Sequence, residues 1–72
     1  MVKPTLVTNR IRVLRSERGE MTQADQAERV GVTRQTLIAI EQSRYSPSLE
    51  VAFRIARVFE LPLDDVFQYP GE

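Results

Sequence analysis

The feature that most constrains the fold is the stretch Thr22–Glu41, TQADQAERVGVTRQTLIAIE. At about 100° per residue, Ala27 and Val30 fall on one side of a first helix, and charged residues gather on the other. Thr22 is placed to cap this helix, and Gly31 has the backbone freedom for a sharp change of direction. The pattern therefore predicts two short helices joined by a tight turn.

The second of these helices, capped by Thr33, has an outer face of distinctive chemistry. Leu37 and Ile40 are three residues apart and are predicted to face the core. The opposite face carries Gln35, Ile38 and Gln42, flanked by Arg34 and Ala39. In a DNA major groove, amides pair with adenine, guanidinium groups pair with guanine, and small apolar groups contact the thymine methyl. The face is typical of a DNA-reading helix, although two glutamines on a helix are also consistent with simple solvation.

Several short motifs occur in an order and spacing that make a specific resemblance. They are T-Q at the start of the first helix, the A-x-x-V-G-V-T turn, R-Q-T and I-E in the second helix, and Y-x-P-S-L after it. Over residues 9–67 the sequence resembles the lambda-repressor-like, Cro-type (XRE) family of helix-turn-helix regulators. The resemblance implies an all-α, five-helix lambda-repressor-like DNA-binding domain at residues 9–67. An N-terminal arm at residues 1–8 and a C-terminal tail at residues 68–72 would flank it.

The resemblance also assigns residues to roles. Its recognition helix, here residues 33–41, would enter the major groove, and the residues facing the bases would be Thr33, Arg34, Gln35, Ile38 and Ala39. Those predicted to contact phosphates are Gln23, Thr36, Arg44, Tyr45 and, because of its charge, Arg10. Arg12 and Arg18 are most simply solvated, with phosphate contact as the alternative. An ion pair between Arg15 and Glu41 would tie the helices together. The implied function is sequence-specific binding of double-stranded DNA by a small transcriptional regulator, a repressor or autoregulator.

Three positions depart from the family pattern. Gln26 stands on the inward side of the first motif helix, where the family has leucine, and a buried amide without partners costs roughly 1–3 kcal/mol. We expect either a hydrogen-bonded Gln26 or reduced stability. Ser43 stands where the family has a left-handed glycine, at a cost of about 1 kcal/mol. Glu20 is an extra residue before T-Q, and an insertion in a surface turn costs little.

Composition limits the classes of function. Seventy-two residues allow one domain, and the chain contains no cysteine and no histidine. The commonest general base and metal ligand is therefore missing. The adjacent carboxylates Asp64 and Asp65 fit a helix start better than acid/base work, because neighbours in a helix point about 100° apart. We expect no enzyme, metal or cofactor. No apolar run reaches the ~20 residues of a membrane span, and the N-terminus lacks the apolar core of a signal peptide, which predicts a cytoplasmic location.

Charge is balanced overall but not along the chain. Ten Lys and Arg residues balance ten Asp and Glu residues. Residues 1–19 carry 5 − 1 = +4, whereas residues 46–72 carry 2 − 5 = −3. One end can thus meet phosphates while the other avoids them, although scatter in a short chain would give the same distribution.

The remaining segments give coarser expectations. Helix one is predicted from Thr8 or Asn9 to about Arg18, ended by Gly19, and the residues before it form either a free arm or an edge strand. Ser46 and Pro47 are predicted to start helix four as cap and first helical residue. Its core stripe would be Leu49, Ala52, Ile55, Ala56 and Phe59, and a short helix at residues 63–67 would follow.

Apolar residues are in surplus late in the chain. Candidates for a homodimer interface are Val51, Phe53, Val58, Phe67 and Tyr69. Relatives in the family bind two-fold sites as dimers, although a thick monomer core would use the same residues. The alternative function is a protein-interaction module of the same fold, such as an antitoxin-like subunit that acts with a partner protein.

Overall fold

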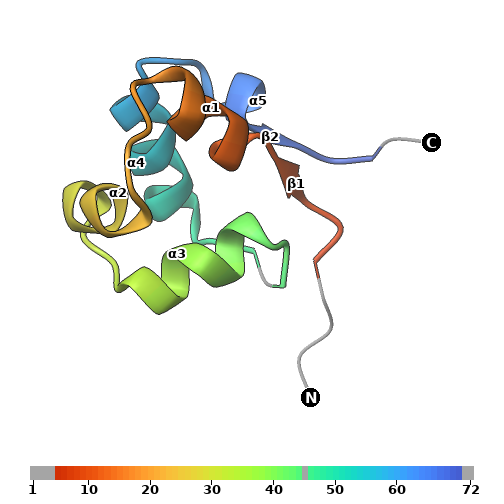
Figure 1. Cartoon of the computed structure of the whole chain (residues 1–72). Coiled ribbons are helices and arrows are strands. Elements are labelled where there is room, and N and C mark those ends of the chain that lie inside the picture. The colour runs from red at the N-terminus through yellow and green to blue at the C-terminus, as the bar shows by residue number, and fades with distance from the viewer. Residues whose placement is uncertain (1–4, 45, 71–72) are drawn as a thin grey trace.

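The computed structural model describes residues 5–44 and 46–70, which form five helices and two short strands (Figure 1). In chain order these are β1 (Thr8–Asn9), α1 (Ile11–Glu17), α2 (Gln23–Val30), α3 (Arg34–Glu41), α4 (Leu49–Phe59), α5 (Leu63–Val66) and β2 (Phe67–Gln68). The predicted all-α, five-helix class is confirmed, with a two-stranded sheet added. Tyr45, a predicted phosphate contact, lies outside the described residues. No helix in the described ranges has the length and apolar character needed to cross a membrane.

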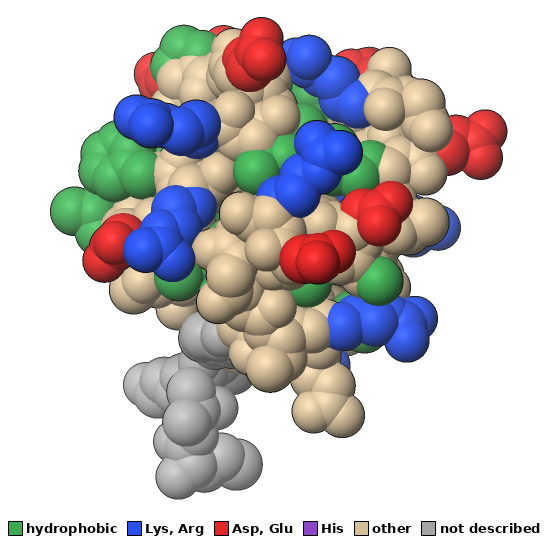
Figure 2. All heavy atoms as spheres, turned by 90° about the vertical axis from the view of Figure 1, so that its left-hand side faces the viewer, with side chains coloured by type: hydrophobic (Ala, Val, Ile, Leu, Met, Phe, Trp, Pro, Cys, Tyr) green, Lys and Arg blue, Asp and Glu red, His purple; other side chains and the backbone are tan. Residues whose placement is uncertain are grey.

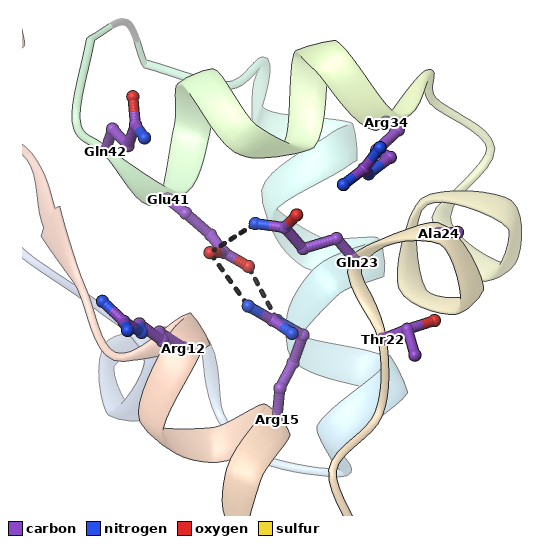
Figure 3. Close-up of a pocket in the computed structure, with 8 residues that line it drawn as sticks. All are labelled: Arg12, Arg15, Thr22, Gln23, Ala24, Arg34, Glu41 and Gln42. Atoms are coloured by element: carbon purple, nitrogen blue, oxygen red, sulfur yellow. Dashed lines mark hydrogen bonds and ion pairs between the residues drawn. The ribbon is translucent and has the colours of Figure 1, made fainter.

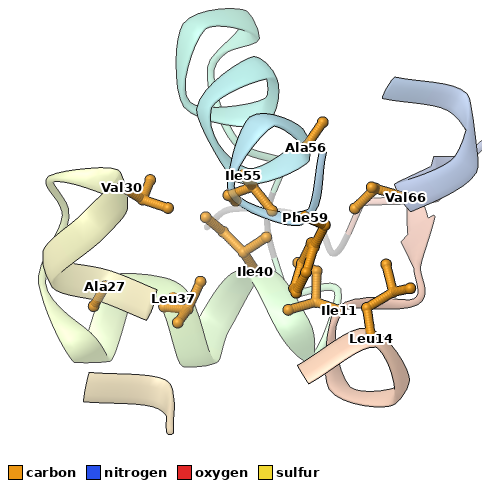
Figure 4. Close-up of a cluster of buried hydrophobic side chains, with 10 residues drawn as sticks. All are labelled: Ile11, Leu14, Ala27, Val30, Leu37, Ile40, Ile55, Ala56, Phe59 and Val66. Atoms are coloured by element: carbon orange, nitrogen blue, oxygen red, sulfur yellow. The ribbon is translucent and has the colours of Figure 1, made fainter. Parts of the chain in front are cut away.

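One hydrophobic core joins all five helices (Figure 4). Helix α4 packs against both α2 and α5, and α2 also packs against α3. The core residues are Ile11, Leu14, Ala27, Val30, Leu37, Ile40, Ile55, Ala56, Phe59 and Val66. Each large side chain among them stabilises the fold by about 1.5–3 kcal/mol through burial. The residues predicted to face the core from α2 and α3, which are Ala27, Val30, Leu37 and Ile40, are buried in the structure.

The turn between α2 and α3 forms as the sequence predicts. Thr22 Oγ1 accepts a hydrogen bond from the Asp25 N–H (3.0 Å), and Thr33 Oγ1 accepts one from the Thr36 N–H (3.1 Å). Gly31 adopts a left-handed conformation with φ of +89°, and its N–H donates to the Ala27 carbonyl at 2.8 Å. A residue with a Cβ is strained in this conformation, so glycine allows the sharp turn between the two helices without strain.

The start of α1 differs from the prediction, because the helix begins at Ile11 and not at Thr8 or Asn9. Those two residues form β1, which pairs antiparallel with β2 so that Thr8 faces Gln68. The Asn9 side chain accepts from the Ile11 N–H (3.1 Å) and donates to the Ile40 carbonyl (2.9 Å). The strand therefore lies in residues that were expected to begin helix one. Of the preceding segment, for which a free arm or an edge strand was left open, residues 5–7 belong to no helix or strand, and residues 1–4 lie outside the described part of the chain.

Helix α4 begins two residues later than predicted. Its cap is Ser48, not Ser46, because Ser48 Oγ accepts a hydrogen bond from the Val51 N–H at 3.2 Å. Leu49 is therefore the first helical residue and is 68% exposed, so its assignment to the core stripe was wrong. Ala52 and the other three predicted stripe residues are buried.

The candidate interface residues divide into two groups. Val51, Val58 and Phe67 are half-buried and pack against the core, as expected for a thick monomer core. Phe53 and Tyr69 are 52% and 66% exposed. Phe67 belongs to β2 rather than to the last helix, since α5 ends at Val66.

Two of the departures from the family occupy left-handed backbone. Glu20 has a φ of +61° directly after Gly19, at +81°, and this reversal lets the Met21 N–H donate to the Arg15 carbonyl at 3.1 Å. Ser43 has a φ of +57° after α3. Glycine adopts such angles without strain, whereas a Cβ costs roughly 1–2 kcal/mol there.

Replacing Ser43 by glycine should therefore raise the free energy of unfolding by up to about 1 kcal/mol. Urea denaturation of the free domain measures the change. Ser43→Ala is the matched control, because alanine removes the hydroxyl but keeps the Cβ and should give no gain. If the alanine variant were stabilised as much as the glycine variant, backbone strain at Ser43 would not be the cause.

Candidate nucleic-acid interface

The outer face of α3 presents polar side chains to solvent. Arg34 and Gln35 are exposed at its start and Gln42 at its end, while Ile38 and Ala39 are half-buried. The Thr33 hydroxyl donates to the Thr36 hydroxyl at 2.9 Å, so the helix start is fixed by side chains as well as by its cap. Among the predicted base-reading residues, Thr33, Arg34 and Gln35 are the most accessible.

A largely buried ion pair holds α1 against the end of α3. Arg15 Nε lies 2.7 Å from Glu41 Oε2, and Arg15 Nη2 lies 3.1 Å from Glu41 Oε1, with side chains only 14% and 7% exposed. Arg15 Nη1 also donates to the Met21 carbonyl at 2.9 Å. Gln23 Nε2, at the start of α2, donates to Glu41 Oε1 at 3.3 Å (Figure 3). The pair that the resemblance implied is present, and it fixes the relative positions of α1, α2 and α3.

These contacts form the floor of an open cleft between α1, the start of α2 and α3 (Figure 3). Its volume is about 720 Å³, and its lining residues are Arg12, Arg15, Thr22, Gln23, Ala24, Arg34, Glu41 and Gln42. Three arginines and one glutamate give the lining a net charge of 3 − 1 = +2, although the whole chain is neutral. The first residues of α2 add their N–H groups and the positive end of the helix dipole. The cleft is therefore suited to binding anions, and the phosphate groups of a DNA backbone are anions.

The arginines that line the cleft are not the arginines that the sequence predicted to contact phosphates. Arg10 does not line it, because its Nη1 reaches the Asp65 carbonyl of α5 at 3.3 Å. Arg18 Nη2 donates to the Phe59 carbonyl at the end of α4 (2.6 Å). Arg12, for which the sequence left open a solvated charge or a phosphate contact, lines the cleft. Its spacing of three from Arg15, which places the two on one helix face, was the available signal.

The surface on the side of α2 carries charges of both signs. Figure 2 shows the side on which α2 lies, where arginines and carboxylates alternate. The exposed charges of α2 are Asp25, Glu28 and Arg29. Within the described ranges, no group of three or more His, Cys, Asp or Glu side chains could hold a metal ion.

The remaining predicted phosphate contacts lie at the end of the motif. Thr36 is half-buried in α3, and Arg44, just after α3, is exposed.

Comparison with known families decides the classification. A family model described as helix-turn-helix matches residues 11–66, from the start of α1 to the end of α5. The chain belongs to this helix-turn-helix family. It is the lambda-repressor-like, XRE-type family that the motifs resemble.

The helix-turn-helix chain is similar to curated relatives over most of its length. An uncharacterized HTH-type transcriptional regulator of Methanothermobacter thermautotrophicus is 57% identical over 58 residues, which cover 79% of this chain and 83% of the relative. Another, of Methanocaldococcus jannaschii, is 48% identical over 52 residues, covering 72% and 79%. The HTH-type regulator YgzD of Bacillus subtilis is 44% identical over 59 residues, covering 82% and 88%.

Proposed function

We propose that this helix-turn-helix domain binds double-stranded DNA sequence-specifically, as a homodimeric transcriptional repressor or autoregulator with α3 in the major groove. One observation carries the proposal. The exposed face of α3 lies directly beside the cationic cleft, and Arg34 belongs to both. A surface that reads bases next to one that holds phosphates is what a DNA-binding helix-turn-helix requires.

The base contacts come from α3. A major groove is about 12 Å wide and admits one helix. Arg34 and Gln35 are exposed at the start of α3, the part of a recognition helix that reaches base edges. A guanidinium group pairs bidentately with guanine and an amide with adenine, so these two residues would supply most of the specificity. Thr33, Ile38 and Ala39 would contribute smaller polar and apolar contacts.

The phosphate contacts come from the cleft. The Gln23 amide has two N–H bonds, and Glu41 accepts only one of them, so the other can donate to a phosphate oxygen at the start of α2. Arg12 supplies a cation on the α1 side. Thr36 and Arg44 would extend this contact along the DNA backbone. So few cations predict a modest affinity per subunit that falls as salt rises.

Alanine substitutions test which residues read bases. Arg34→Ala and Gln35→Ala should each weaken binding to a selected site by about 1–3 kcal/mol and relax preference at one base pair per half-site. Fluorescence anisotropy on the selected duplex and its single-base variants measures both effects. Arg29→Ala, which removes an exposed arginine outside the cleft, should leave affinity and preference unchanged.

Because Arg12 lies in the cleft, its replacement should affect DNA binding differently from that of Arg34 or Gln35. Arg12→Ala should weaken binding equally on all duplexes and reduce the slope of log affinity against log salt by about one. If Arg34→Ala and Gln35→Ala behaved in this uniform way, they would be phosphate contacts and not base readers.

A protein-interaction module is the second candidate, and the exposed side chains of Leu49, Phe53 and Tyr69 favour it. Measuring binding affinity at several salt concentrations distinguishes the two functions. DNA binding weakens steeply as salt rises, whereas an apolar protein contact hardly changes.

A further inference from the structure

A second hollow, the loop hollow, opens beside the cationic cleft, between α1 and the turn that precedes α2. Its volume is about 330 Å³, and its lining residues are Arg12, Arg15, Ser16, Glu20, Met21 and Thr22. The loop hollow shares Arg12, Arg15 and Thr22 with the cleft, so the two adjoin. Among its lining residues, only Glu20 has a negatively charged side chain. The loop hollow therefore adds a carboxylate to a surface that is otherwise suited to phosphates.

Backbone contacts hold Glu20 at the edge of this surface. Glu20 is the residue that the family pattern lacks before T-Q, and it follows Gly19 with a left-handed φ of +61°. The next residue, Met21, donates its N–H to the Arg15 carbonyl at 3.1 Å and accepts from Arg15 Nη1 at 2.9 Å. Arg15 is paired with Glu41 in the floor of the cleft. The backbone beside Glu20 is therefore fixed relative to the proposed phosphate contacts.

Glu20 lowers the net positive charge of this surface. Arg15 and Glu41 are paired with each other. The other two cations of the cleft, Arg12 and Arg34, form no ion pair within the described part of the chain. Glu20 is exposed and has no ion-pair partner among the described residues. With Glu20 included, the net charge of the cleft and the loop hollow together is 3 − 2 = +1, compared with 3 − 1 = +2 without it.

A carboxylate in this position opposes the approach of a phosphate group. Both Glu20 and Arg12 are exposed and line the loop hollow, so the carboxylate is available to Arg12 when no DNA is bound. Duplex DNA carries one negative charge per about 1.7 Å of its axis, and charges act on one another over a Debye length of about 8 Å at physiological salt.

We propose that Glu20 is an affinity-determining residue, whose carboxylate competes with DNA phosphates for Arg12. Phosphate contacts carry no sequence information, so the competition lowers the affinity for every duplex by the same factor. The inference rests on the proposed function, because it concerns the same DNA-binding surface. It gives the residue inserted before T-Q a role in setting how tightly the domain holds DNA.

Removal of the charge at Glu20 tests this role. Glu20→Gln keeps the Cβ and the length of the side chain, so it changes the charge without changing the backbone strain. The variant should bind the selected duplex and duplexes of unrelated sequence about two- to fivefold more tightly, the range expected of one exposed charge interaction. The gain should shrink as salt rises, because salt shortens the Debye length. Fluorescence anisotropy measures the affinity at each salt concentration.

Glu60 supplies the matched control. It is exposed and left-handed, with a φ of +58°, but it lines neither the cleft nor the loop hollow. Glu60→Gln makes the same chemical change and should leave the affinity for DNA unchanged. Circular dichroism checks that every variant is folded.

A double-mutant cycle tests whether Glu20 acts through Arg12. In a chain that already carries Arg12→Ala, Glu20→Gln should lose most of its gain, because the cation for which the carboxylate competes is absent. A gain as large as in the wild-type background would overturn the competition for Arg12. Equal effects of Glu20→Gln and Glu60→Gln would overturn the role of Glu20 altogether.

The inference and the proposed function fail in different ways. If the wild type binds the selected duplex and Glu20→Gln binds it with the same affinity, Glu20 has no such role and the proposed DNA binding stands. If neither the folded wild type nor the folded Glu20→Gln variant binds any duplex at low salt, both proposals are overturned.

Discussion

Replacing Glu41 by leucine should lower the free energy of unfolding by about 3 kcal/mol, because it leaves Arg15 buried without a counter-charge. The pair is almost closed to solvent, and Glu41 also accepts from Gln23. Stability of a domain this small is only a few kcal/mol, so the variant should be largely unfolded at 37 °C. Urea denaturation at low temperature measures the loss.

Removing both charges should cost less than removing one. Arg15→Met combined with Glu41→Leu should recover a large part of the loss, since no unpaired charge stays buried. The exposed pair between Arg54 and Glu50, with side chains 51% and 75% exposed, supplies the matched control. Glu50→Gln should change stability by no more than about 0.5 kcal/mol. A Glu41 variant as mild as Glu50→Gln would show that the ion pair does not organise the fold.

Replacing Gln26 by leucine should raise the free energy of unfolding by about 1–3 kcal/mol. Gln26 is fully buried, and neither its amide nitrogen nor its amide oxygen has a hydrogen-bond partner. Of the two outcomes expected from the sequence, the structure shows the unpaired amide. Leucine has a similar volume and no polar group to desolvate, and in a domain of this size 1 kcal/mol raises the melting temperature by about 4–8 °C.

The control is an exposed glutamine. Gln42→Leu makes the same chemical change at an exposed position and should alter stability by less than about 0.5 kcal/mol. A melting temperature that Gln26→Leu left unchanged or lowered would contradict the account of Gln26 as an unsatisfied core residue.

The parts predicted correctly from the sequence depend on neighbours in the chain. Thr22, Gly31 and Thr33 act on backbone groups within four residues of themselves, so their spacing alone determines the caps and the turn. The buried stripes of α2 and α3 follow from helical period in the same way. The left-handed Ser43 was predictable because the resemblance places glycine there.

The parts missed depend on residues far apart in the chain. Both Ser46 and Ser48 can cap a helix, and only packing against the core decides which does. Leu49 has a suitable period for the α4 stripe, but it stands at the exposed first turn of the helix. Strand β1 exists because β2, some 60 residues later, pairs with it. The positions of Arg10 and Arg12 relative to the cleft follow from where α5 and α3 lie relative to α1, which no local pattern contains.

Selection of bound duplexes from a random DNA pool at moderate salt tests the central claim most directly. The account predicts enrichment of a two-fold symmetric motif, with half-sites about one helical turn apart, and loss of binding as salt rises. Arg34→Ala and Gln35→Ala should each relax one base pair of that motif. Folded protein that enriches no sequence at any salt concentration would contradict the account and favour the protein-interaction module.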